Sequence, residues 1–301
     1  MEERLRKRAR KKFISAALAS ELVRLPSALN KQYATTFGCQ SEILIAGNGE
    51  LHAAYYCRRR WCQTCASITM ATLIDKYTPT LEQMQDLHFV TLTIRNCSAD
   101  NLPDTLRLMQ TTWRKILDNA RKRGQPCKGI RKLELKASTK YGYHPHFHIL
   151  VEGEQAARYL HDEWLRRLPR YTVADAQDMR KVEDVHSAAI EIMKYATKLT
   201  CADDTKNEPL CTASQMDIIF RTLEGKRLIQ PFGGLNGISE NEFEITPEVV
   251  RKAAGIYKWF GHDWYHIDFG QPLTNYVPEA DEIQLYVRSW RSEKGKTRGQ
   301  C

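Results

Sequence analysis

Four short segments in the central part of the chain alternate apolar and more polar residues with a period of two. In the first of them, Val90, Leu92 and Ile94 occupy every second position. The four segments are residues 88–95, 131–137, 146–151 and 178–185. Successive side chains of a β-strand point to opposite faces, so this period is typical of strands with one buried face. The sequence therefore predicts four strands.

Apolar residues recur at helical spacing between and after these strands. The clearest stripe follows Pro103 and consists of Leu106, Met109, Trp113, Ile116, Leu117 and Ala120. Residues 156–168 and 187–199 show the same spacing, so three helices are predicted. The order β-α-β-β-α-β with a final helix predicts an α+β fold, a ferredoxin-like (split βαβ) antiparallel sheet with helices packed on it.

The pattern also suggests three regions along the chain. Residues 1–85 contain a basic helix and then a Cys-rich segment, and we expect an accessory region there. Residues 86–235 form the predicted central domain. Residues 236–301 are a predicted C-terminal extension with no assigned role, in which a helical pattern is formed by Val250, Ala253, Ala254, Tyr257 and Phe260.

The net charge of the chain indicates which class of partner it binds. The chain has 45 Lys and Arg residues against 36 Asp and Glu residues, a formal net charge of +9, which favours a polyanionic partner. The basic residues cluster at 4–12, 58–60 and 121–123. Such clusters suit contacts with the phosphates of a nucleic acid.

Cysteine usage and hydropathy indicate the compartment. Nine cysteines, an odd number, without an export signal favour a reducing cytoplasm over a framework of disulfides. No stretch approaches the roughly 20 apolar residues that cross a bilayer, so no membrane association is expected.

The segment 144–148, His-Pro-His-Phe-His, is the first candidate for chemistry. On a strand, His146 and His148 share one face and can bind a single metal ion. Glu134, on the polar face of the neighbouring predicted strand, would complete two imidazoles and one carboxylate, and His144 competes for that third position. Such a set leaves open positions for substrate oxygens. The alternative is that both histidines are solvated strand residues.

A second candidate lies on the last predicted helix. Glu191, Tyr195 and Lys198 are neighbours on one helix face because residues three and four apart are adjacent there. A phenol is a weak nucleophile until it loses its proton, so a base or cation beside it is the expected supporting chemistry. The alternative is a packing tyrosine flanked by surface ion pairs.

Three segments together resemble the motifs of the HUH endonuclease superfamily, in particular of plasmid rolling-circle initiators whose third motif carries a Glu and a Tyr four residues apart. FVTLTIRN is similar to the first motif, HPHFHILV to the second and EIMKYATK to the third, in that order. KRLIQPFGGL is similar to a segment that follows the tyrosine helix in these initiators, which extends the resemblance to about residue 235.

The resemblance implies a mechanism. Tyr195 would attack a phosphodiester in a single-stranded or hairpin origin with flanking duplex, leaving a 5′-phosphotyrosyl enzyme and a free 3′-OH. Mg²⁺ or Mn²⁺ at His146 and His148 would polarise the scissile phosphate. Glu191 would activate water for a later hydrolysis, and Lys198, or less surely Lys194, would stabilise the phenolate or phosphate. A host helicase and polymerase would be the protein partners.

A third candidate is the segment Cys57-x4-Cys62-x2-Cys65, with Cys39 upstream. Four closely spaced thiolates suit a tetrahedral structural Zn²⁺. The initiators carry a similar Cys-rich stretch, but Gln63 and Thr64 stand here where a proline often precedes the last cysteine. Arg58 to Arg60 would then lie on a rigid knuckle facing DNA. Free buried cysteines are the alternative.

Two other functions compete with a replication initiator. An HUH-type transposase has the same chemistry, and only genetic context separates the two. A non-catalytic, zinc-containing DNA-binding regulator would make the histidine pair incidental. A conjugative relaxase is disfavoured because its tyrosine motif precedes the histidines.

Overall fold

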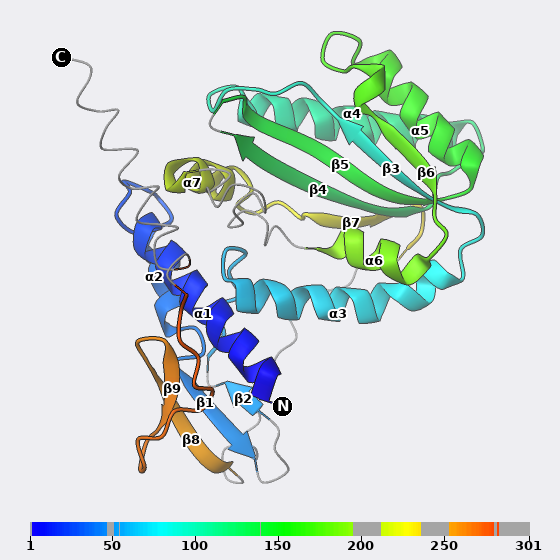
Figure 1. Cartoon of the computed structure of the whole chain (residues 1–301). Helices are drawn as coiled ribbons and strands as arrows, with labels where there is room; N and C mark the ends of the chain where they lie inside the picture. Colours follow the sequence, from blue (N-terminus) through cyan, green and yellow to red (C-terminus); the bar gives the residue numbers. More distant parts are fainter. Residues whose placement is uncertain are drawn as a thin grey trace, which may run out of the picture. The chain divides into compact units, whose positions relative to one another are not determined.

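The computed structural model of the chain describes residues 2–46, 51–53, 55–138, 140–194, 212–235, 253–279 and 282 (Figure 1). The chain divides into two compact units. Unit 1 comprises residues 1–69, 195–217 and 241–301, and unit 2 comprises residues 70–194 and 218–240. Each unit has its own antiparallel sheet, so the fold belongs to the α+β class that the pattern predicts. In the described ranges no helix is both long and apolar enough to cross a membrane.

Unit 2 is built on a five-stranded sheet with the order β6-β3-β5-β4-β7. The strands are β3 (Leu87–Thr93), β4 (Gly129–Ser138), β5 (Gly142–Glu152), β6 (Asp178–Lys181) and β7 (Ile229–Phe232). All neighbouring strands are antiparallel. All four predicted strands are present, although the predicted strand 178–185 ends at Lys181 as β6 and Val185 begins a helix. Strand β7 adds an edge strand that the sequence pattern does not predict.

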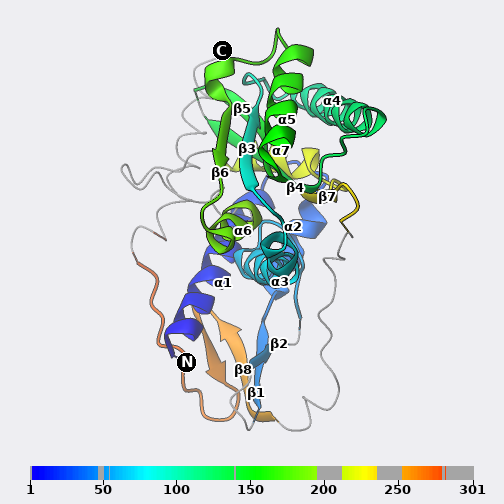
Figure 2. The same cartoon turned by 90° about the vertical axis from the view of Figure 1, so that its right-hand side faces the viewer.

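Helices cover both faces of this sheet. Helices α4 (Leu102–Lys122) and α5 (Glu154–Arg167) lie on one side, and α6 (Val185–Met193) lies on the other (Figure 1 and Figure 2). Phe147 of β5 is fully buried between the sheet and the first pair, with its ring 5.8 Å from Trp113 of α4 and 5.6 Å from Trp164 of α5. Aromatic packing of this kind fixes β5, and therefore the residues on its opposite face, against a rigid layer.

Helix α6 is shorter than its pattern predicts. It begins after Asp184, whose carboxylate accepts hydrogen bonds from the backbone N–H groups of His186 and Ser187, as a helix N-cap should. It ends at Met193, since Lys194 has a non-helical backbone with φ −51° and ψ 104°. The prediction of one continuous helix over residues 187–199 is therefore wrong at Lys194. Residues 195–199 lie outside the described residues.

Unit 1 contains α1 (Glu2–Leu22), α2 (Asn30–Gly38) and a four-stranded sheet with the order β2-β1-β8-β9. The strands are β1 (Glu42–Ala46), β2 (Leu51–Ala53), β8 (Ala253–Phe260) and β9 (Asp263–His266). Two further helices, α3 (Gln63–Glu82) and α7 (Ala213–Thr222), each contain residues of both units. A single 3-10 turn, Ala174–Ala176, precedes β6.

From Ala253 to Phe260 the predicted helix is a strand, β8, whereas Val250 lies outside the described residues. Tyr257 and Trp259, two residues apart, pack on a core with Ala9, Ile43 and Trp264, whereas Phe260 is 79% exposed. Buried residues therefore recur at every second position, as in a strand. The spacing of three between Tyr257 and Phe260, which predicts a helix, does not reflect burial. Helix α1 and strands β1, β8 and β9 contribute to this core, so residues from the predicted C-terminal extension complete a sheet begun by the N-terminal region.

Candidate functional site

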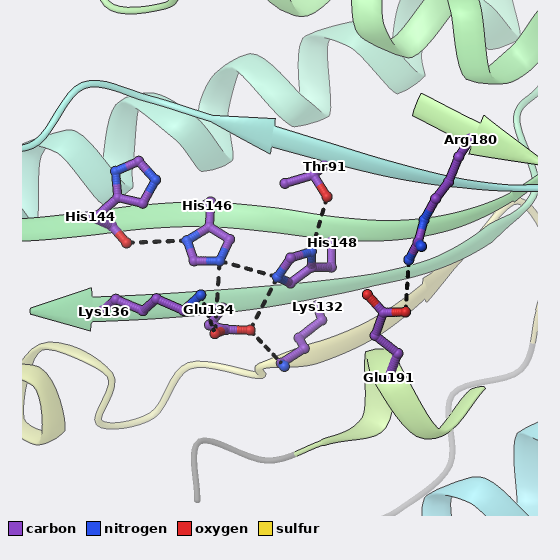
Figure 3. Close-up of polar contacts among 9 residues, drawn as sticks. All are labelled: Thr91, Lys132, Glu134, Lys136, His144, His146, His148, Arg180 and Glu191. Carbon is purple, nitrogen blue, oxygen red and sulfur yellow. Dashed lines mark hydrogen bonds and ion pairs between the residues drawn. The ribbon is translucent and has the colours of Figure 1, made fainter. Parts of the chain in front are cut away.

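The three predicted metal ligands meet on one face of the unit 2 sheet. Glu134 of β4 lies directly opposite His146 of β5, and His148 lies two residues further along β5 on the same face. The Nε2 atoms of the two histidines are 3.1 Å apart, and a carboxylate oxygen of Glu134 lies 3.2 Å from Nε2 of His148 (Figure 3). The other oxygen lies 3.8 Å from Nε2 of His146. The strand register therefore assembles the donor set.

This arrangement fits a bound metal ion. Two nitrogens that lie about 2.1 Å from one ion, at a right angle to each other, are about 3.0 Å apart. Nδ1 of His146 lies 3.2 Å from the carbonyl oxygen of His144, and Nδ1 of His148 lies 3.2 Å from Oγ1 of Thr91. With a metal bound, an Nδ1–H on each ring would donate to that oxygen and leave both Nε2 lone pairs for the ion, whereas without a metal an Nε2–H of His148 can donate to the Glu134 carboxylate.

Burial and charge keep these ligands in the protonation states that metals need. Burial lowers the pKa of His146 to about 3, so its imidazole is neutral near pH 7. Burial acts to raise the pKa of Glu134, but the hydrogen bond to His148 and the positive charge of Lys132 hold it well below its usual range. The ammonium of Lys132 lies 2.8 Å from that carboxylate. The carboxyl group is thus ionised.

His144, the competing third ligand, lies apart from this group. Its Nδ1 atom is 2.7 Å from the side-chain oxygen of Asn96, and it does not belong to the set of donor atoms that lie within 4.8 Å of one another. That set is Glu134, His146 and His148. The geometry therefore favours Glu134 as the third donor.

Residues of the third motif are only partly described. Glu191 of α6 forms an ion pair of 2.7 Å with Arg180 of β6, whose guanidinium stacks 4.7 Å above the ring of Phe89. That ring in turn lies 5.6 Å from the ring of His148, so Glu191 faces the metal-ligand side of the sheet (Figure 3). Lys194 is exposed. Tyr195 and Lys198 lie outside the described residues.

The four predicted zinc ligands form a second cluster, in unit 1. Three of its sulfur pairs, Cys39–Cys65, Cys57–Cys65 and Cys62–Cys39, are 3.5, 3.7 and 3.7 Å apart. Four sulfurs bound at about 2.3 Å to a tetrahedral zinc ion are about 3.8 Å apart. All four cysteines are buried. The residues after Cys39 and Cys57, namely Gln40 and Arg58, both have positive φ, 53° and 54°, so the backbone turns sharply next to each sulfur.

Two lysines near these clusters were not predicted from the sequence. Lys132 contacts Glu134. This contact could have been predicted from the sequence, because residues two apart on a strand share a face. Lys12 is buried in α1, although it belongs to the basic run that we expected to contact phosphates. It follows the buried Ala9 by three residues and precedes the buried Ser15 by three, which places it on the inward stripe of the helix.

Other residues of the basic run are also engaged within unit 1. The Arg8 guanidinium donates to the side chain of Gln40 and to the hydroxyl of Tyr56, and Lys11 donates to Ser67. Arg10 pairs with Glu282. Several basic residues of α1 therefore form contacts within unit 1.

A sheet that presents two imidazoles and a carboxylate within ligand distance, in a chain that also buries four clustered thiols, defines a protein with two candidate metal centres. The chain belongs to the replication protein family, whose sequence model matches residues 48–252. This match includes the three motif segments and three of the four clustered cysteines. It confirms the resemblance to plasmid replication initiators that the motifs indicated.

Individual relatives are distant. The chain is 31% identical over 110 residues to a protein named "Protein rep" from Staphylococcus aureus, covering 34% of this chain and 47% of the relative. It is 25% identical over 223 residues to a "Protein rep" from Bacillus amyloliquefaciens, covering 63% of this chain and 65% of the relative. The matched region thus spans less than two thirds of the length of either relative. No solved structure matches the chain significantly.

Proposed function

We propose that the chain is a plasmid rolling-circle replication initiator that nicks and rejoins single-stranded DNA at an origin through a 5′-phosphotyrosyl bond to Tyr195. The convergence of Glu134, His146 and His148 on one sheet face carries this proposal, because it supplies a metal-ligand set in the motif order of the family. The strand order β6-β3-β5-β4 also agrees with the ferredoxin-like arrangement expected for an HUH endonuclease domain within residues 86–235.

The donor set suits Mg²⁺ or Mn²⁺. Two imidazoles and one carboxylate leave coordination positions for phosphate oxygens, and such an ion, when bound, polarises the scissile phosphodiester. The ammonium groups of Lys132 and Lys136 lie 2.8 and 3.5 Å from the carboxylate of Glu134. Two positive charges beside one negative charge favour binding of a phosphate anion even without a metal.

In the cleavage step the phenolate oxygen of Tyr195 attacks phosphorus. An O–P bond forms to the tyrosine, and the bond from phosphorus to the 3′ oxygen breaks, which releases a 3′-OH for a polymerase. The reverse reaction, with a 3′-OH as nucleophile, rejoins the strand. Lys198, with Lys194 as the alternative, would stabilise the phenolate or the phosphate.

Glu191 is the proposed general base for the terminating step. Its carboxylate would take a proton from water, the hydroxide equivalent would attack phosphorus, and Tyr195 would leave. Arg180 holds that carboxylate on the ligand side of the sheet by an ion pair of 2.7 Å. With hydrolysis available, one tyrosine suffices for two cleavages.

The thiol cluster is the proposed site of a structural Zn²⁺ held by Cys39, Cys57, Cys62 and Cys65. Its sulfur spacing and burial suit tetrahedral coordination. Arg58 to Arg60 lie between two of these cysteines, and we propose that they contact flanking duplex DNA. A host helicase and polymerase are the proposed protein partners.

A covalent adduct is the test. The full-length protein is incubated with single-stranded origin oligonucleotide labelled on the 5′-phosphate side of the nick, in Mn²⁺, and resolved by denaturing electrophoresis. We expect an adduct that Tyr195→Phe abolishes and that Tyr141→Phe, a change at an exposed tyrosine near the β4–β5 turn, leaves intact. Mapping the modified tyrosine to another position would remove Tyr195 from the mechanism. No adduct from any strand would favour the non-catalytic regulator, and adducts formed on transposon ends would favour the transposase.

A further inference from the structure

Lys12 is a buried ammonium group beside the thiol cluster. Its residue is 3% exposed, and its Nζ atom donates hydrogen bonds to the backbone carbonyl oxygens of Cys39 and Phe37. The ring of Trp259 from β8 lies 5.0 Å from the same nitrogen. The ammonium of this α1 residue therefore contacts the segment that carries the first clustered cysteine and strand β8.

The charge of this group lacks an ordinary partner. In the part of the chain that the structure describes, no carboxylate forms an ion pair with Lys12. Its electrostatic neighbours are the sulfurs of Cys39, Cys57, Cys62 and Cys65. Two neutral carbonyls accept from two of the three N–H groups but do not compensate the charge, and an uncompensated buried cation is costly.

A zinc ion bound by four thiolates would supply the missing negative charge. Each bound cysteine is deprotonated, so four thiolates and one Zn²⁺ carry a net charge of −2. The backbone N–H of Cys57, which lies 3.5 Å from Sγ of Cys39, is already placed to donate to such a sulfur. Backbone N–H donors, which also include that of Cys65 toward Cys62, carry no net charge and do not neutralise two negative charges in a buried site, whereas a nearby ammonium offsets one of them.

We propose that Lys12 is the buried counter-ion of an anionic four-cysteine zinc centre and thereby makes the packing of α1 and β8 depend on the metal. This inference rests on the proposed zinc site. The basic run at residues 4–12 suggests contacts with DNA. The inference assigns one of its lysines, Lys12, to the metal centre instead.

Zinc affinity tests the inference. The full-length wild type, Lys12→Met and Lys12→Arg are compared by zinc content after purification and by competition with a chromophoric chelator. We expect Lys12→Met to bind zinc roughly 10- to 100-fold more weakly, the range typical of residues that support metal ligands, and Lys12→Arg to recover part of the loss. Lys11→Met is the matched control, since its ammonium contacts Ser67, and should bind zinc as the wild type does.

Melting temperatures separate this role from a merely structural one. With the metal removed, Lys12→Met should melt no lower than the metal-free wild type, because it lacks the uncompensated charge, while the increase on adding zinc should be smaller than in the wild type. A packing role alone would lower both melting temperatures equally. If the wild type binds no zinc, the zinc proposal and the inference both fail. If it binds zinc and Lys12→Met binds it equally well, only the inference fails.

Discussion

The Nε2 atoms of His146 and His148 face each other at 3.1 Å, and both face the carboxylate of Glu134. Two imidazole lone pairs at this distance repel each other unless a proton or a cation lies between them. A proton on one Nε2 atom or a divalent cation would relieve this repulsion, and the divalent cation is the occupant proposed here.

Removing either imidazole should therefore abolish metal-dependent nicking. Loss of a residue that hydrogen-bonds to a metal ligand typically weakens metal binding roughly 10- to 100-fold. Because His146 and His148 are themselves the proposed ligands, we expect His146→Ala and His148→Ala to weaken Mn²⁺ binding by more than that. Mn²⁺ binding, followed by paramagnetic resonance, and nicking rate are the two measurements. His144→Ala, which changes the neighbour that contacts Asn96, is the control, and an equal loss there would make His144 a ligand.

Acid should destabilise the metal-free protein through His146. Burial lowers the folded-state pKa of His146 to about 3 from an ordinary value of 6.5, so between those pH values only the unfolded chain takes up this proton. The free energy of unfolding should therefore fall as pH falls from 6.5 to about 3. Denaturant unfolding at several pH values should show a shallower dependence for His146→Gln. An unchanged slope would mean that His146 is accessible to solvent in the folded protein.

Glu191 should separate nicking from release. Glu191→Gln keeps the shape of the side chain but cannot accept a proton, so we expect normal adduct formation and hydrolytic release slowed by about 100-fold or more. Arg180→Gln should slow release to a smaller degree, because Glu191 keeps its chemistry and loses its ion pair. Glu183→Gln, at an exposed carboxylate just before α6, is the control. Undiminished release by the Glu191→Gln protein would assign the base to another residue.

The start of α6 offers a test of stability that does not involve a metal. Asp184→Ala removes the side chain that accepts from the N–H groups of His186 and Ser187, and should lower the free energy of unfolding. Asp184→Ser should retain most of it. If both variants unfold as the wild type does, the cap contributes nothing to folding.

The thiol cluster should respond as a unit to a single substitution. Cys62, 1% exposed, is the most buried of its four members, and Cys62→Ser should eliminate stoichiometric zinc and cost more than about 4 kcal/mol, as expected for the loss of a metal site. Cys97→Ser, outside the cluster, should keep the metal. Retention of zinc by the Cys62→Ser protein would exclude the fourfold thiolate site.

The sequence predicts those features that depend on local periodicity. The strands around His88 and His146 follow from alternation, and the pairing of His146 with His148 follows from the geometry of a strand. The third ligand depends on the register between β4 and β5, which places Glu134 opposite His146. That register is set at the hairpin, where Gly142 has φ 77°, and periodicity contains no information on it.

Unit 1 was harder to predict because its sheet joins distant segments. Ile43 of β1 pairs with Tyr257 of β8, far along the chain, and nothing in the sequence of either strand identifies its partner. The aromatic residues of β8 fit a helical spacing as well as an alternating one, so only the pairing with β1 distinguishes the two. The burial of Lys12 was missed for a similar reason, since its neighbours come from β8 and from the loop after α2.

The pairing of β1 with β8 has a consequence for biosynthesis. A ribosome completes β1 about two hundred residues before it reaches β8, whereas most of unit 2 is one continuous stretch, residues 70–194. Domains generally fold as they leave the ribosome, so the sheet that carries the histidines can form before β8 has been synthesised and can pair with β1. A nascent or prematurely terminated chain would thus carry β1 with one unsatisfied hydrogen-bonding edge, a state that invites aggregation.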